Sequence, residues 1–414
     1  GNSAATIGLT GFQMAGGSTK QAEDLGAGAR LVAEVRAMVP TLRERARGAE
    51  ESRRIPEGTL NDLIKIGLFK AVVPRRFGGF EVDYKHIPHI FRELARGCTS
   101  TSWAMGLLMY DNFQFAQFPD QAQQDVWGNN RNSLAAGQVM PGGKATPTEG
   151  GYILNGRWAY ATGIQHSNWM LLSATIEGGE KRPDIHRFFV PTTEFEVIDT
   201  WDVSAMGATG SHDVTLTDVF VPTHRQIPLN LLRNAEGPGL AANPGPLWRI
   251  PLLVFMTFGA VGTLLGAAEA VSELTLEMLK NRIGAYSTNA LSKQMSTRVR
   301  LTEKMMHLQA IRTLFDNRIE WLTEHFNSGH SLTREQRVEL RAVSNHIARM
   351  SQYIVNEMAR EAGTRACTFN YMPIQRFQRD INSLATHALF DMDQTGDHYG
   401  GMLLGMEVPP EAMI

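Results

Sequence analysis

The chain has 414 residues, of which 43% are hydrophobic and 20% charged, and its formal net charge is −2. This length predicts several domains with a large shared core and excludes a single small binding module. The lack of a basic excess argues against nucleic acid as a partner. Because the first residues lack the basic stretch and apolar core of a signal peptide, the sequence predicts a cytoplasmic protein. The two cysteines lie far apart, and we expect no metal site.

The first third of the chain has the spacing of helices. Residues 1–24 are rich in Gly, Ser and Thr, and we expect a loose leader there. Residues 25–130 carry apolar side chains at helical intervals, with Gly67 placed to end one helix and a short amphipathic helical turn over 121–127. These features predict an N-terminal helical domain.

The pattern changes between 131 and 228 to short apolar runs broken by Gly, Pro and Asn. Alternation with frequent turn residues predicts a compact antiparallel β-domain. Residues 229–249 contain three Pro and three Gly, which predicts a structureless connection. A connection of this length is a linker or a lid over a site, and we expect a lid.

A long uncharged run, IPLLVFMTFGAVGTLLGAA, follows at 250–268 and is just long enough to span a bilayer. Glycines and threonines dilute the run, Pro251 opens it, and Glu269 and Glu273 continue the same helical pattern. This composition is also typical of a helix buried on all sides in a bundle. We therefore expect a core helix and no membrane span.

Residues 250–395 predict a helical bundle, and 396–414 a C-terminal tail. Thr333 with Gln336 suits a capping box, and Gly363 is placed to end the same helix. Bundle-facing stripes are expected from Leu301, Met305, Leu308, Phe315, Ile319 and Leu322, and then from Leu340, Val343, Ile347, Ile354 and Met358.

Four stretches at the joints between these parts resemble the acyl-CoA dehydrogenase superfamily over roughly residues 30–400. They are GLFKAVVPRRFGG at 67–79, NGRWAYATG at 155–163, MGATGSHDVTLTDVFVP at 206–222 and PIQRFQRD at 373–380. The resemblance implies an α+β multidomain fold with an N-terminal helical domain, a middle antiparallel β-domain and a C-terminal four-helix bundle. It also implies a homotetramer in which flavin lies between the β-domain and the bundle, with a neighbouring subunit closing the site.

The chain departs from the dehydrogenases at their catalytic base. They place an acidic residue shortly after the Arg-Asp pair, whereas here Arg379-Asp380 is followed by His387-Ala388 at the matching positions. The stretch from His387 onward, THALFDMD, is similar to flavin-dependent hydroxylases of aromatic and steroid-derived phenols. The resemblance therefore implies a hydroxylase and argues against a dehydrogenase.

Such a hydroxylase is the oxygenase component of a two-component monooxygenase. The resemblance implies that an NAD(P)H-dependent flavin reductase supplies reduced flavin, FMN more readily than FAD, and that a flavin C4a-hydroperoxide formed with O2 hydroxylates a small aromatic or polycyclic substrate. The chain shows no GxGxxG fingerprint after a strand, so the reductant is expected to come from elsewhere.

Several residues are expected at the flavin because of their positions in the family pattern. The resemblance implies that the hydroxyl of Thr162 donates to the flavin edge near N5 and O4 and protects the hydroperoxide. Tyr160 is expected to pack on the isoalloxazine and Trp103 to lie near it. Gln138 belongs to the segment that matches the flavin-binding strand.

A second group matches positions that contact the flavin farther from its ring. Arg282 occupies a place where the family often has an arginine facing the flavin phosphate, a role suited to a permanently charged guanidinium. Gly363 and Thr364 match the region that supplies backbone amides to flavin.

The resemblance also implies three residues at the substrate. His387 is expected to titrate near neutrality and to take the phenol proton. Tyr110 and Asp111 match a helix where the hydroxylases commonly show a second histidine. Asp111 is expected to act as a base or to pair with a cationic group on the substrate.

Three alternatives stay open at this point. The same fold hydroxylates nitrogen or sulfur centres, which an amine paired with Asp111 would favour. A dehydrogenase with a relocated base is the second alternative, and an inactive flavoprotein-like scaffold is the third.

Overall fold

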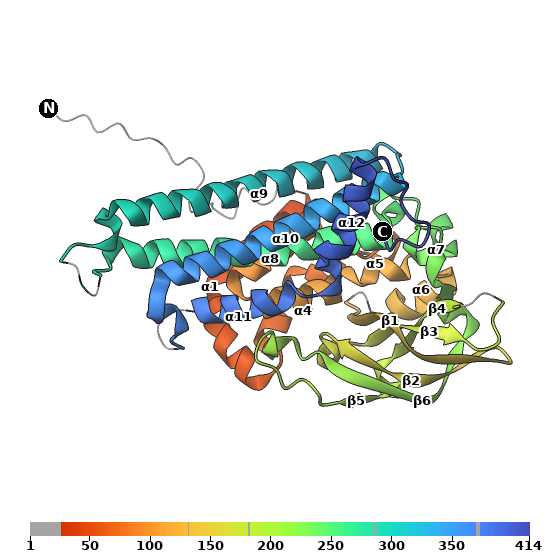
Figure 1. Cartoon of the computed structure of the whole chain (residues 1–414). Coiled ribbons are helices and arrows are strands. Elements are labelled where there is room, and N and C mark those ends of the chain that lie inside the picture. The colour runs from red at the N-terminus through yellow and green to blue at the C-terminus, as the bar shows by residue number, and fades with distance from the viewer. Residues whose placement is uncertain (1–25, 131, 181–182, 285, 287, 370–372) are drawn as a thin grey trace.

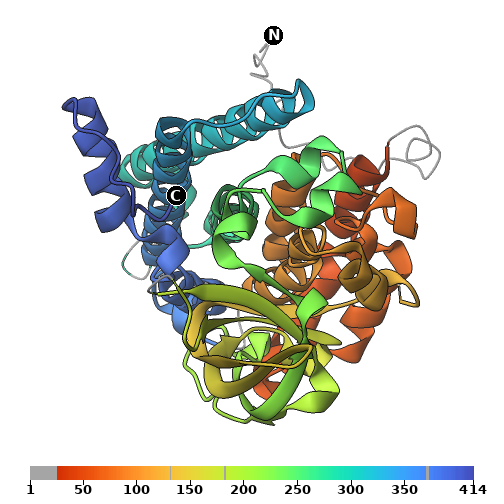
Figure 2. The same cartoon turned by 90° about the vertical axis from the view of Figure 1, so that its right-hand side faces the viewer.

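The computed structural model describes residues 26–414 apart from 131, 181–182, 285, 287 and 370–372 (Figure 1). The expected leader at 1–24 lies outside the described residues. Figure 2 shows the sheet below the junction of the N-terminal helices and the C-terminal helices, so all three parts meet in one region.

Six helices form the N-terminal part: α1 (Ala27–Ser52), α2 (Glu57–Ile66), α3 (His86–Gly97), α4 (Thr99–Tyr110), α5 (Asn112–Phe115) and α6 (Asp120–Trp127). Gly67 ends α2 with a φ of 82°, as predicted from its freedom to adopt left-handed backbone. α4 is buried along nearly its whole length because α3 covers it on one side and β1 on another. It is therefore the helix best placed to form a wall of an internal site.

The sheet has seven strands: β1 (Ala135–Thr148), β2 (Gly151–Ala161), β3 (Trp169–Ile176), β4 (Ile185–Pro191), β5 (Glu196–Ile198), β6 (His212–Pro222) and β7 (Gln226–Pro228). Their order is β5-β6-β2-β1-β3-β4-β7. The expected antiparallel domain is mostly antiparallel, but β1 and β3 run parallel. The reason is that β2 returns along β1, and the chain then crosses at 162–168 to the other side of β1 before β3 begins.

The C-terminal part contains α8 (Leu252–Asn281), α9 (Met295–Asn327), α10 (Arg334–Ala362), α11 (Ile374–Leu384) and α12 (Met392–Leu403). The first four pack together as the expected bundle. The capping box of Thr333 and Gln336 is present at the start of α10, and Gly363 ends that helix. Both local predictions are confirmed.

α8 contains the long uncharged run. By length and composition it would cross a membrane, but 94% of its most apolar stretch is buried inside the molecule. Its neighbours are α3, α4 and α10. The expected core helix is therefore confirmed.

Two expected segments differ from the observed structure. Residues 229–249 are not structureless, because they contain α7 (Leu229–Arg233) and a fully buried Trp248 whose indole N–H bonds Glu81 at 2.9 Å. Their role as a lid stays a prediction. The boundary drawn at 395 lies inside α12, and the expected tail ends in a buried Ile414.

Candidate active site

The crossing after β2 lies against α4. Gly163 has a φ of 73°, and a Cβ there would lie 3.0 Å from the side chain of Leu108. One turn and a half earlier on α4, the Trp103 ring meets the His387 ring edge-on, with centroids 5.2 Å apart. The structure thus brings His387 against Trp103 near the start of α4, and Gly163, the neighbour of Thr162, against Leu108 on a later turn.

A chain of three hydroxyls begins at Thr162. Its Oγ1 lies 2.7 Å from Oγ of Ser211, which lies 2.8 Å from Oγ1 of Thr209. Thr209 donates to the carbonyl of Met206 at 2.8 Å. When the Thr209 hydroxyl donates to this carbonyl, which also accepts from the indole N–H of Trp201 at 3.0 Å, Ser211 donates to Thr209 and Thr162 donates to Ser211.

The expected role of Thr162 as a donor to flavin stays a prediction. In this order its proton goes to Ser211, and Thr162 then offers lone pairs to a ligand at its side. Ser211 and Thr209 lie in the stretch 206–222 that carried the family resemblance, but the direction of their hydrogen bonds is not visible in the sequence.

Met206 joins the end of this chain to a buried carboxyl. It has a left-handed φ of 57°, which is strained for a residue with a side chain. Its N–H donates to Oδ1 of Asp380 at 2.6 Å. Burial raises the pKa of Asp380 to about 7, although this hydrogen bond and the nearby Arg379 act in the opposite direction.

We expect Asp380→Asn to gain stability relative to the parent as the pH rises. The folded pKa of Asp380 is about 7 and its ordinary value is 3.8, so the native state holds an extra proton between these limits. The contribution of Asp380 is full below about pH 4 and falls by up to about 1.4 kcal/mol per pH unit until about pH 7. The substituted amide keeps an acceptor for the N–H of Met206 and has no proton to lose. Melting temperatures of both proteins at about pH 5 and pH 8 test this, and a constant difference would contradict it.

His387 is neutral in this structure. Its Nδ1 accepts a hydrogen bond from the N–H of Leu389 at 3.2 Å, which requires an unprotonated Nδ1. Although the residue keeps solvent contact, the surrounding protein desolvates its ring and lowers the pKa of His387 to about 4. The lowered pKa of His387 argues against the expected titration near neutrality, and its role at the substrate stays a prediction. The remaining proton sits on Nε2, so the free edge of the ring is a donor.

The two other residues expected at the flavin ring are arranged differently. Tyr160 has a φ of 61° and is 66% exposed, and its ring meets the Trp201 ring edge-on. The side chain of Gln138 is occupied, because it donates to the carbonyl of Ala159 and accepts from the N–H of Met140. It ties β1 to β2, and its backbone carbonyl is engaged as well, because it accepts from Arg187.

The two other residues expected at the substrate, Tyr110 and Asp111, lie at the end of α4. Asp111 is buried, and burial raises its pKa to about 7 against the opposing effect of Arg187. Tyr110 belongs to the core, because its ring packs against Phe91 and Phe255. Its packing there does not support a direct substrate contact. Arg187, fully buried on β4, was missed by the sequence analysis.

Arg282 lies with Gly363 in a separate group. Its guanidinium donates to the carbonyl of Ala362, and a Cβ on Gly363 would lie 3.1 Å from Nη2. Thr364 follows on the exposed surface. Figure 1 shows the junction of α8 and α9, where Arg282 lies, at the left end of the bundle and the sheet toward the right.

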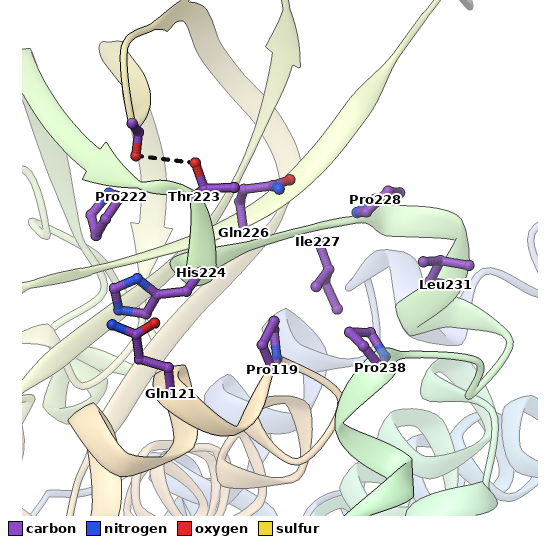
Figure 3. A pocket seen from close by; sticks show the side chains of 11 residues that line it. Pro119, Gln121, Pro222, Thr223, His224, Gln226, Ile227, Pro228, Leu231 and Pro238 are labelled. Atoms are coloured by element: carbon purple, nitrogen blue, oxygen red, sulfur yellow. Dashed lines mark hydrogen bonds between the residues drawn. The ribbon is translucent and has the colours of Figure 1, made fainter.

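A surface hollow of about 500 Å³ lies between α6, the end of β6 and α7 (Figure 3). Its lining includes Pro119, Gln121, His224 and Pro238. His224 is paired with Asp125 at 2.6 Å. Because none of the residues expected at the flavin or the substrate lines it, this hollow is not the candidate site.

Comparisons with known proteins identify the family of the chain. Residues 28–129 match the acyl-CoA dehydrogenase N-terminal domain, and residues 257–392 match the C-terminal domain. The chain is 30% identical over 378 residues to the pigment production hydroxylase of Rhodococcus sp., covering 91% of this chain and 97% of that protein. It is 29% identical over 396 residues to the oxygenase component of the FADH2-dependent resorcinol hydroxylase of Rhizobium sp., covering 91% and 95%. The crystal structure of 3-HSA hydroxylase from Rhodococcus sp. RHA1 has a TM-score of 0.86 at 28% identity, covering 92% and 97%.

The fold and these matches define a flavoprotein of the acyl-CoA dehydrogenase type. Within it, the chain belongs to the flavin-dependent monooxygenases that serve as oxygenase components of two-component systems. Its cofactor is a reduced flavin, and an oxygenase component implies a separate flavin reductase. The predicted family, fold and class of enzyme are confirmed, and the dehydrogenase and scaffold alternatives are set aside.

Proposed function

We propose that this oxygenase hydroxylates a phenolic aromatic or polycyclic substrate. Reduced flavin supplies two electrons, one atom of O2 enters the substrate as a hydroxyl, and the other leaves as water. The related resorcinol hydroxylase acts on a phenol, which supports this substrate class. An N-hydroxylase acting on an amine is less well supported, because the cationic Arg187 lies beside the carboxylate that would bind the amine.

The observation that supports the proposal is the 2.7 Å contact between the hydroxyls of Thr162 and Ser211, in which we assign Thr162 as the donor. Reduced flavin has a proton on N5, whereas oxidised flavin has only a lone pair there. A hydroxyl that donates its own proton to Ser211 can accept a hydrogen bond from N5–H of reduced flavin. Its lone pairs repel the lone pair on N5 of oxidised flavin. The residues present fit a reduced flavin, which Thr162 would contact at N5 and against which Tyr160, an exposed residue, would pack.

We further propose a homotetramer in which Arg282 and Gly363 of a neighbouring subunit reach the flavin phosphate. Their position at the far end of the bundle from the sheet supports this arrangement. α9 also exposes Met295, Val299 and Met306 at intervals of four and seven residues, on one face of the helix. Such an apolar face suits contact with another subunit.

The choice of flavin and of compartment also belongs to the proposal. The preference for FMN over FAD stays a prediction from the sequence, and the FADH2-dependent relative favours FAD instead. The cytoplasm, where NAD(P)H for the reductase is available, is the proposed compartment.

Within this function we assign His387 the role of hydrogen-bond donor through Nε2, and not that of a base. We expect His387→Asn, which keeps an N–H donor but is not basic, to retain hydroxylation within about threefold of the parent. His387→Leu should lose about tenfold, the value of one hydrogen bond. Product formation in single turnovers measures both. Equal losses in the two variants would contradict the donor role.

The source of electrons tests the proposed function. Chemically reduced FMN or FAD, mixed with the protein, O2 and resorcinol or larger phenols, should give hydroxylated product without a reductase. NAD(P)H with oxidised flavin and the protein alone should give none. Turnover driven by NAD(P)H alone would contradict a two-component system.

A further inference from the structure

One strained residue, Met206, lies between α11 and the residues expected at the flavin ring. Its φ of 57° places it in the left-handed region, which is unfavourable for a residue with a side chain. Such a conformation persists only where the surrounding structure holds it. Both backbone polar groups of Met206 are engaged, the N–H by Asp380 and the carbonyl by Thr209 and Trp201. These contacts therefore fix the direction of its backbone.

The N–H side of Met206 is held from α11. This N–H donates to Oδ1 of Asp380, which is buried, at 2.6 Å. The preceding residue on α11, Arg379, donates to the carbonyl of Ser204 at 2.6 Å. Glu50 on α1 in turn pairs with Arg379 at 2.6 Å. α11 therefore holds the turn at two points, and α1 supports α11 there.

The carbonyl of Met206 begins a first route, which leads to Thr162. It accepts from Oγ1 of Thr209 at 2.8 Å, and the hydroxyls of Ser211 and Thr162 continue the chain. The carbonyl of Thr209 also accepts from the N–H of Gly163 at 3.0 Å. The turn after Met206 is thus tied to the side chain of Thr162 and to the backbone that follows it.

The same carbonyl begins a second route, which leads to Tyr160. It accepts from the indole N–H of Trp201 at 3.0 Å. The Trp201 ring meets the Tyr160 ring edge-on, with centroids 6.1 Å apart. Because Tyr160 is exposed, this contact helps to set the direction of its ring. A displacement of Met206 would therefore disturb the supports of Tyr160 and Thr162 together.

We propose that Asp380 is a positioning residue of the flavin site. By holding the strained Met206, it places the one carbonyl that orients Thr162 along the first route and Tyr160 along the second. Asp380 takes part in no chemical step and acts through Met206 alone. The inference rests on the proposed contacts of Thr162 and Tyr160 with flavin, and it adds the residue that sets both.

Anaerobic titration of the whole protein with oxidised and reduced FMN or FAD tests this role without a substrate. Asp380→Ala removes the acceptor, so the preference for reduced over oxidised flavin should fall about tenfold, the value of one hydrogen bond. Both redox states should also bind about twofold to tenfold more weakly, because the Tyr160 ring loses its support. Asp380→Asn keeps an acceptor at the same place and should resemble the parent. A role of Asp380 that depended on its charge would not give this rescue.

Two further variants separate the routes. Thr209→Val cuts the first route and should lower only the preference for reduced flavin. Trp201→Phe keeps an aromatic ring but lacks the indole N–H, and it should weaken the binding of both redox states equally. Asn345→Ala removes a buried hydrogen bond to Thr395 between α10 and α12. It is the control for a general loss of stability and should keep the parent's affinities.

Parent-like binding in folded Asp380→Ala, or equal losses in Asp380→Ala and Asp380→Asn, would overturn the inference. If circular dichroism shows that Asp380→Ala does not fold, the two route variants decide. Parent-like binding in both Thr209→Val and Trp201→Phe would then overturn it. A parent protein that prefers reduced flavin but hydroxylates no phenol would contradict the proposed function and leave the role of Asp380 supported.

Discussion

Ser211→Ala is expected to change which redox state of flavin the protein prefers. In the parent, Thr162 gives its proton to Ser211 and accepts from N5–H of reduced flavin. Without the Ser211 hydroxyl, Thr162 is free to donate to the unprotonated N5 of oxidised flavin. The preference for reduced over oxidised flavin should fall about tenfold, the value of one hydrogen bond.

Anaerobic titrations with both redox states measure this preference. Ser211→Thr keeps a hydroxyl and is the matched control, which should resemble the parent. Thr162→Val removes the contact itself and should divert most of the oxygen to free hydrogen peroxide instead of product. An unchanged affinity ratio in Ser211→Ala would show that the order of donors along the three hydroxyls is not the one derived from Met206.

Arg282→Gln is expected to weaken FMN and FAD binding by about tenfold to a hundredfold, because hydrogen bonds to charged groups contribute about 1.5–3 kcal/mol. Riboflavin, which has no phosphate, should bind equally to the variant and the parent. Arg298→Gln removes an exposed arginine at the start of α9 and is the control for a general loss of positive charge.

Mixed oligomers test whether Arg282 acts on its own subunit's flavin or on a neighbour's. Arg282→Gln and Thr162→Val subunits are each expected to be impaired alone. When the two are assembled together, some sites combine an intact Thr162 with an intact Arg282 from the neighbour, and hydroxylation should return. Failure to recover activity in verified mixed oligomers would place both residues in one subunit's site.

Local signals predicted helix ends well, and long-range contacts account for the errors. Gly67 and the capping box of Thr333 depend on a few neighbouring residues, and both are as expected. α12 was missed because its glycines disfavour a helix, yet Asp391 caps its first turn. A hydrogen bond from Asn345 to Thr395 at 2.9 Å then fixes α12 on α10.

In the candidate site, too, local motifs predicted which residues take part, whereas long-range contacts decide what each residue does. Thr162 was predicted, but its acceptor role depends on Ser211, 49 residues further along the chain. The pKa of His387 depends on the protein packed around its ring, which no motif specifies. Arg187 was passed over although an arginine beside the apolar run FFVP was a usable signal, because the direction of its side chain depends on the strand's register.

Oxygen-18 labelling tests the central claim most directly. The protein, reduced flavin and a panel of phenols beginning with resorcinol are mixed with labelled O2, and the products are analysed by mass spectrometry. We predict one labelled oxygen atom in the hydroxylated product, and none when only the water is labelled. Reoxidation of the flavin with all labelled oxygen recovered as hydrogen peroxide across the panel would contradict the assignment as a phenol-hydroxylating oxygenase.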